Sequence, residues 1–177
     1  MAGYFSASTF RQVGNAGTTQ NLFTIDNIDA TKLVTVRRLN IQMDATAVLV
    51  SVMPLLKCSR LTSAASGGTT LTKVPFNTSN TSNANTVVRG STASDGGANS
   101  GPTATPGNIV WQQFGMRLHT AVGQVLGIDN NVLPLLVETQ DYVLKQNEGL
   151  VVHVVAAAGA SNPATNHYFV EVVWEED

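Results

Sequence analysis

Short segments in which apolar and polar residues alternate restrict the fold of this chain more than any other feature. In "YFVEVVWE", residues 168–175, every second side chain from Tyr168 to Trp174 falls on one face of an extended strand. "LVTVRRLNIQMD", residues 33–44, alternates in the same way. A period of two is the period of a β-strand, so both segments are predicted to be strands of a half-buried sheet.

Other segments are rich in β-branched or large apolar residues and end at turn residues. They are residues 47–53, 55–61, 69–75, 109–114, 132–137, 142–144 and 150–157. Only two short segments, 114–120 and 138–144, resemble helices. A chain of about eight to ten short strands with turn-rich connections is typical of an all-β protein with an antiparallel β-sandwich or jelly roll. We predict a single domain that spans residues 1–177.

A long polar stretch, residues 77–108, interrupts this pattern. It consists almost entirely of Asn, Thr, Ser, Gly, Ala and Pro, and only Val87, Val88, Arg89 and Asp95 differ. Burial of so few large apolar groups does not offset the entropy lost on ordering. Because strands on both sides are needed for one core, we interpret the stretch as a long Ser/Thr/Asn/Gly-rich insertion loop. We expect a neighbouring molecule to order it.

The charge of the chain excludes some partners. Charged residues make up only 12% of the sequence, about half the usual share, and the net charge is −2. Basic residues do not cluster beyond Arg37 and Arg38, whereas nucleic-acid binding needs a basic patch. The apolar run at residues 150–158 is too short to span a bilayer, and the N-terminus lacks a signal-peptide pattern. We therefore expect a soluble protein, made in a cytoplasm, that binds neither nucleic acid nor membrane.

The histidines and the single cysteine do not form a catalytic or metal-binding pattern. His119, His153 and His167 are not at metal-ligand spacing from one another or from Cys58. His153 lies inside the strand "VVHVV" and Cys58 follows an apolar run, so packing roles are favoured for both. No phosphate-binding loop and no Gly-x-Ser-x-Gly elbow is present. We expect no cofactor and no bound metal.

The carboxylates give no stronger signal. Asp26 and Asp29 in "DNID" are expected on one loop, and Asp129 in "GIDNN" resembles a fragment of an oxygen-rich cation site. For both segments, turns with Asx hydrogen bonds are the plainer interpretation. Two matches to the N-glycosylation pattern, at Asn77 and Asn80, are expected by chance in a segment of this composition. The sequence thus favours a structural or binding protein over an enzyme.

Three segments together resemble virion proteins of tailed bacteriophages. They are "CSRLTSAASGGTTLTKVPFNTSNTSNANTVVRG" (58–90), "DYVLKQNEGLVVHVVAAAGASNPATNHYFVEVVWEED" (141–177) and the polar insertion itself. The chain is similar to the small jelly-roll proteins that decorate, or cement, phage heads. This resemblance implies a homotrimer that binds the major capsid protein on the outer capsid surface. It also implies stabilisation of the head through buried interface, without catalytic residues, and a location in the virion after synthesis in the host cytoplasm.

The N-terminal segment and the few larger residues of the insertion are the candidates for such contacts. The candidate interface residues are Tyr4, Phe5, Phe10, Val87, Val88 and Arg89. Aromatic side chains dominate the energetics of many interfaces, which favours the three aromatic residues as buried anchors. Equally, these aromatic side chains could belong to the core of the sandwich itself.

Three other functions remain open. A carbohydrate-binding jelly-roll module of a phage fibre or head appendage would need exposed Trp or Tyr platforms, but Trp111 and Trp174 both lie in strand patterns. A hydrolytic enzyme on a β-sandwich would need two acids that converge in a cleft. A major capsid protein of a small virus is disfavoured because the chain lacks a basic arm.

Overall fold

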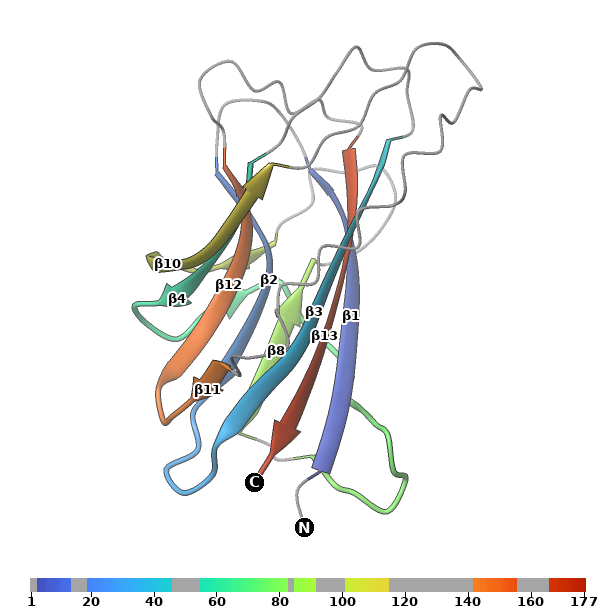
Figure 1. Ribbon diagram of the computed structural model, residues 1–177, viewed down its shortest axis with the longest axis vertical. Coiled ribbons are helices and arrows are strands. Elements are labelled where there is room, and N and C mark those ends of the chain that lie inside the picture. The colour runs from blue at the N-terminus through green and yellow to red at the C-terminus, as the bar shows by residue number, and fades with distance from the viewer. Residues whose placement is uncertain are drawn as a thin grey trace.

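The computed structural model describes residues 3–13, 19–45, 55–82, 85–91, 101–114, 142–155 and 166–177. Throughout these residues the regular structure is β-strand, which confirms the predicted all-β class (Figure 1). Several sequence-based predictions lie outside the described residues. They are the strands at 47–53 and 132–137, residues 115–120 of the helix candidate 114–120, the turn at Asp129, and His119.

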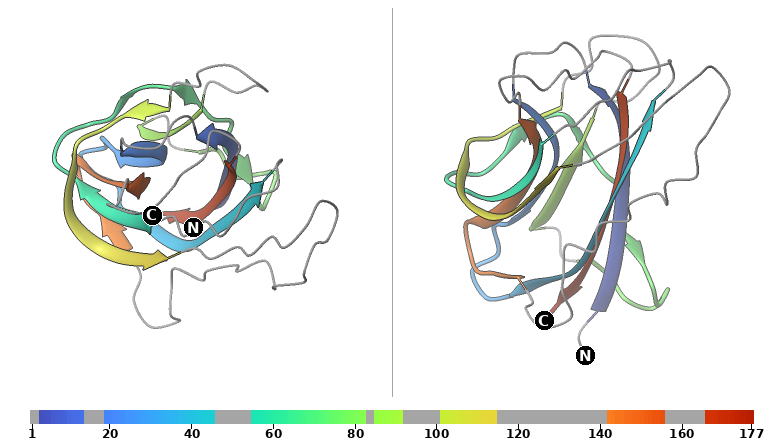
Figure 2. Two further views of the ribbon diagram at one scale, coloured as in Figure 1. Left: turned by 90° about the horizontal axis from the view of Figure 1, so that it is seen from above. Right: turned by 45° about the horizontal axis from the view of Figure 1, so that its top comes forward.

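The strands form two large antiparallel sheets that face each other as a β-sandwich (Figure 2). Sheet A has the strand order β11 (Tyr142–Leu144), β3 (Val34–Ala45), β13 (Asn166–Glu176), β1 (Gly3–Val13) and β7 (Val74–Pro75). Sheet B has the order β10 (Pro106–Phe114), β4 (Leu55–Leu61), β12 (Glu148–Val155), β2 (Gln20–Asn27), β8 (Thr86–Gly90) and β6 (Thr69–Thr70). A small third sheet pairs β5 (Ser66–Gly67) with β9 (Pro102–Thr103).

The long strands pair in a nested order. β1 pairs with β13, β2 with β12, β3 with β11, and β4 with β10, each pair antiparallel. Successive strands from β1 to β4 alternate between sheet A and sheet B. Residues 62–105 connect β4 to β10, the innermost pair of the nested strands. Most of the polar insertion therefore lies in this connection. The first and last strands lie side by side, and both termini are at the same end of the sandwich (Figure 1).

The core lies between the two sheets and is built from the alternating positions predicted for 168–175. Tyr168, Val170, Val172 and Trp174 are all fully buried. The ring of Trp174 stacks on Phe5 with 5.9 Å between the ring centroids, and its indole Nε1 donates a hydrogen bond of 3.0 Å to Glu176. The alternation of β13 is thus the sequence signal that correctly locates the core face of sheet A.

The polar stretch 77–108 is not one continuous loop in the described residues, which corrects the sequence-based interpretation. Residues 86–90 form β8, which pairs with β2 on one side and with β6 on the other. The side chains of Thr86 and Val88 are buried. The ladder to β2 provides the backbone hydrogen bonds of β8, and burial of Val88 adds apolar stabilisation. The polar composition of residues 77–108 as a whole gives no sign of this buried residue. Residues 86–90 are therefore held by their own domain.

Most predicted strands are confirmed, with small shifts at their ends. The matches are β3, β4, β10, β11, β12 and β13. The predicted strand 69–75 is divided into β6 and β7, and the helix candidate 138–144 is wrong over 142–144, which form β11. The bounds of β1 and β2 were not predicted. In β1 small Ser and Thr side chains weaken the contrast between the two faces, and in β2 residues 22–27 are buried on both faces, so apolar and polar residues do not alternate.

Candidate functional site

Cys58 and His153, the residues that could in principle act as a nucleophile and as a base, are both buried. Burial raises the pKa of the Cys58 thiol to about 12, so the thiolate needed for nucleophilic attack is not formed near neutral pH. Burial and the nearby Lys57 lower the pKa of His153 to about 4, which keeps its imidazole neutral. His153 pairs with Lys57 on β4 and with Asn21 on β2, on the side of sheet B away from the core. Neither residue is placed for catalysis.

The two carboxylates of "DNID" have different surroundings. Asp29 accepts hydrogen bonds from the backbone N–H and hydroxyl of Thr31 and from the backbone N–H of Lys32, at 2.8–3.0 Å, which confirms the predicted Asx turn. Asp26 is buried on β2 and accepts a bond of 3.4 Å from the backbone N–H of Ala65. Burial raises the pKa of Asp26 to about 6, against the opposing effects of the Ala65 bond and Arg89.

In the part of the chain that the structure describes, no group of three or more His, Cys, Asp or Glu side chains is arranged to hold a metal ion. Across the same residues, no helix has the length and apolar character needed to cross a membrane.

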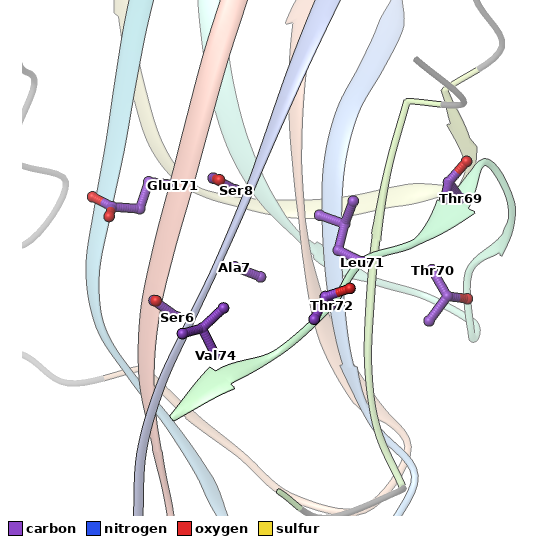
Figure 3. A pocket seen from close by; sticks show the side chains of 9 residues that line it. All are labelled: Ser6, Ala7, Ser8, Thr69, Thr70, Leu71, Thr72, Val74 and Glu171. Atoms are coloured by element: carbon purple, nitrogen blue, oxygen red, sulfur yellow. The ribbon is translucent and has the colours of Figure 1, made fainter. Parts of the chain in front are cut away.

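A groove of about 400 Å³ lies beside the outer side of β1 (Figure 3). Its lining residues are Ser6, Ala7, Ser8, Thr69, Thr70, Leu71, Thr72, Val74 and Glu171. The groove forms because residues 69–74 leave sheet B, where the Leu71 N–H bonds to Val88, and reach β1, where Val74 pairs with Ser6. Hydroxyl groups dominate its polar atoms. This lining offers hydrogen bonds and shape, but it contains no nucleophile paired with a base.

The one carboxylate of the groove is already neutralised within the chain. Glu171 accepts a bond of 2.7 Å from the Asn40 amide and one of 3.2 Å from the Arg38 guanidinium. Figure 3 shows the carboxylate turned away from the side chains of residues 69–74. The groove therefore presents a neutral, hydroxyl-rich surface.

A row of side chains crosses the outer face of sheet A at one level of the strands. The strand register places Val143 opposite Thr35, Thr35 opposite Glu175, and Glu175 opposite Tyr4. Phe76 continues the row, since its N–H donates a bond of 2.9 Å to the carbonyl of Tyr4. Both ends of this row are apolar, whereas its centre is polar. Glu175 in the centre forms an ion pair with Arg37.

The predicted interface residues are divided between surface and interior. Tyr4 and Phe10 point outward and are 42% and 45% exposed. Phe5 and Val88 are completely buried in the core, which corrects the interface prediction for both residues. For Phe5 the alternative of a core position holds. Their positions on the strands, one residue away from outward-facing ones, explain the difference. Val87 and Arg89 are half-buried on β8, where the Arg89 guanidinium donates to the carbonyl of Gly67 at 3.3 Å.

Sequence reasoning missed the other exposed apolar residues of sheet A. Val74 and Phe76 are 55% and 64% exposed, and Leu33 and Val143 are also exposed. The alternation in "KVPF" was a usable signal for Val74 and Phe76, because it places both on one face of a short strand. It does not show which face is outward.

Comparisons with known proteins give no further assignment. No protein-family model, no curated protein and no solved structure matches this chain. The geometry of the described residues therefore carries the functional argument.

Proposed function

We propose that this chain is a non-catalytic structural protein that assembles with copies of itself and with a capsid lattice. In this role it is a decoration, or cement, protein of a phage head, bound as a homotrimer to the major capsid protein on the outer surface. The observation that carries the proposal is the set of exposed apolar side chains on the outer face of sheet A. They come from the N-terminal strand and from residues 74–76, which precede the polar insertion: Tyr4, Phe10, Val74 and Phe76.

The magnitude of this surface suits assembly through several copies. A fully buried aromatic side chain removes about 150–250 Å² from water. Since Tyr4, Phe10 and Phe76 are each about half exposed, covering each one contributes about 2 kcal/mol. A single contact of this kind gives only weak affinity. A trimer that engages three equivalent lattice sites has a much higher overall affinity, because the second and third contacts form within one complex.

The strand order supports the same proposal. We infer that the chain follows a jelly-roll path, because β1-β13-β3-β11 face β2-β12-β4-β10 and the pairs are nested. Jelly rolls are common among viral capsid and lectin domains, although a fold alone does not assign a function.

The groove of Figure 3 favours a second candidate, a carbohydrate-binding module. A neutral lining of Ser and Thr hydroxyls complements the donors and acceptors of an uncharged sugar. The exposed ring of Tyr4 lies two residues from Ser6 on the same face of β1 and offers a stacking platform. Titration with neutral oligosaccharides, followed by chemical-shift changes at Ser6, Ser8 and Thr72, distinguishes this function from assembly.

Mass spectrometry of purified virus particles tests the main proposal. The chain should be present at many copies per particle, and light scattering should give a trimer in solution. The Phe10→Ser variant should bind particles more weakly, whereas Ile109→Ser, which removes an equally exposed apolar side chain from sheet B, should bind normally. Absence from particles, or a stable monomer in solution, would refute the proposal.

A further inference from the structure

The outer face of sheet B lies under a further layer of the chain. This layer, which we call the cover, consists of residues 62–67 and 101–105, and its two segments pair with each other through β5 and β9. Three residues form a cross-strand row on this face and are completely buried, although they point away from the core between the two sheets: Thr24, Val151 and Ser59. Sheet B is therefore shielded on both of its faces.

Side chains of sheet B hold the cover in place. The Asn21 amide donates to two backbone carbonyls of residues 102–104, each at 3.1 Å. The Arg89 guanidinium donates to the carbonyl of Gly67 at 3.3 Å. Neither an amide nor a guanidinium changes its charge between acid and neutral pH, so these bonds do not respond to pH.

Asp26 makes the third contact with the cover. Its Oδ1 accepts the bond from the Ala65 N–H, which is long at 3.4 Å, and its Oδ2 is buried without a hydrogen-bond partner. The carboxyl group packs over Gly149, where an added Cβ would lie 2.7 Å from Oδ1. A carboxylate in this place lacks most of the hydrogen bonds that water would give it, so the closed cover favours the neutral acid.

Other polar atoms on the same face also lack partners. Oγ1 of Thr24, Oγ of Ser59 and Nδ1 of His153 are buried and form no hydrogen bond within the described part of the chain. Burying a polar group without a partner costs free energy, which is regained when water reaches the group. The cover thus closes over a polar surface, and local opening is easier here than at the apolar core between the sheets.

Few charged groups surround Asp26. The cover itself contains no charged residue. Arg89 on β8 faces Asp26 and lowers its pKa, as the Ala65 bond does, but burial dominates and raises this pKa to about 6. His153 on β12 and Lys57 on β4 lie further along the same face, beside Asn21. Of the three side chains that hold the cover, Asp26 is the one whose charge changes between acid and neutral pH.

We propose that Asp26 controls the cover: protonation of its carboxyl group keeps the cover closed over sheet B, and ionisation promotes local opening. This inference concerns sheet B and goes beyond the assembly role proposed for sheet A. In the open state Asp26 meets water and regains an ordinary pKa of 3.8, against about 6 in the closed state. The closed state is therefore most stable below about pH 4 and loses this stability as the pH rises to about 6. Two pKa units change the opening equilibrium by up to about 100-fold.

Thiol labelling at position 24 tests the proposal. Thr24 lies on β2 between Asn21 and Asp26, which both contact the cover, so the side chain of a Thr24→Cys variant becomes accessible when the cover opens. The native Cys58 is buried in the core between the sheets and reacts only when the whole domain unfolds. A dithiopyridine reagent reacts with thiols even in acid, and mass spectrometry of peptides quantifies the labelling at each site.

The informative quantity is the labelling rate at position 24 divided by the rate in Thr24→Cys/Asp26→Asn at the same pH. This ratio should rise by up to about 100-fold from about pH 4 to pH 7, while Cys58 stays protected. The ratio cancels the pH dependence of the reagent and the contribution of His153, which titrates in the opposite sense.

Two control variants and a second measurement complete the experiment. Asp29→Asn, the matched control, removes a carboxylate from the neighbouring Asx turn and should leave the labelling unchanged. Asn21→Ala should raise the labelling equally at every pH. Hydrogen exchange at the Ala65 amide, compared between wild type and Asp26→Asn, should give the same ratio without a cysteine substitution. A ratio that is constant with pH, or equal labelling of positions 24 and 58, would overturn the inference and leave the proposed function standing.

Discussion

Replacing Asp26 by Asn should change the pH dependence of stability. Asp26 is almost fully buried, and its pKa is about 6 in the folded chain against an ordinary value of 3.8. Between these two values the folded state binds more protons than the unfolded state, so stability falls as pH rises from about 4 to about 6. A pKa difference of about two units corresponds to about 3 kcal/mol, and above pH 6 this stabilisation is absent.

His153 has the opposite effect over nearly the same range. Its pKa is about 4 in the folded chain against an ordinary value of 6.5. Between these values the unfolded state binds more protons, so this group makes stability rise with pH, again by about 3 kcal/mol. The two groups lie in different surroundings, Asp26 facing Arg89 and His153 facing Lys57. In the wild-type chain their contributions oppose each other.

The variants should therefore reveal two opposite slopes. Asp26→Asn should be more stable than wild type above pH 6.5 by about 3 kcal/mol and should lose that advantage on acidification to pH 4. His153→Gln should lose stability as pH rises from 4 to 6. The measurement is urea unfolding followed by Trp fluorescence at closely spaced pH values. The double variant is the control and should show neither slope. Parallel pH curves for the wild type and both single variants would refute the assigned protonation states.

Three further outcomes are expected. Gly149→Ala should destabilise the fold by about 2 kcal/mol, because the added Cβ would lie 2.7 Å from the Asp26 carboxylate and from the Ile25 carbonyl; an unchanged Tm would contradict this. Phe5→Ala should cost about 3–5 kcal/mol in urea unfolding by removing the stack on Trp174, whereas Tyr4→Ala should cost far less. Hydrogen exchange should find residues 86–90 protected even in an isolated chain, since β8 pairs with β2 and β6; fast exchange there would show that a neighbour orders them.

The sequence predicts local strand character better than it predicts which face is buried. β13 was located because large apolar residues alternate with charged ones, as in Val170, Glu171 and Val172. In β1 the residues Tyr4 and Phe5 are both aromatic, and only the pairing with β13 decides that Phe5 is inside. That pairing joins segments far apart in sequence, and local periodicity carries no information about it.

The candidate surface was only partly predictable for the same reason. Tyr4 and Phe10 were identified as interface candidates from residue type alone. Val74 and Phe76 join Tyr4 because residues 74–76, which precede the insertion, reach the edge of β1. Val88 was mistaken for a loop residue because its neighbours in sequence are small and polar, although its neighbours in space belong to the core.

The nested pairing of strands has a consequence for the synthesis of the protein. β13 lies between β3 and β1, so sheet A lacks its central strand until residues 166–176 have been translated. Contacts between such distant segments form slowly, because the loop-closure entropy is lost before the contacts stabilise the chain. During that interval β1 and β3 expose the apolar faces that later form the core. We therefore expect sheet A to be completed only after residues 166–176 have left the ribosome, and the yield of native protein to depend on chaperones that bind exposed strands.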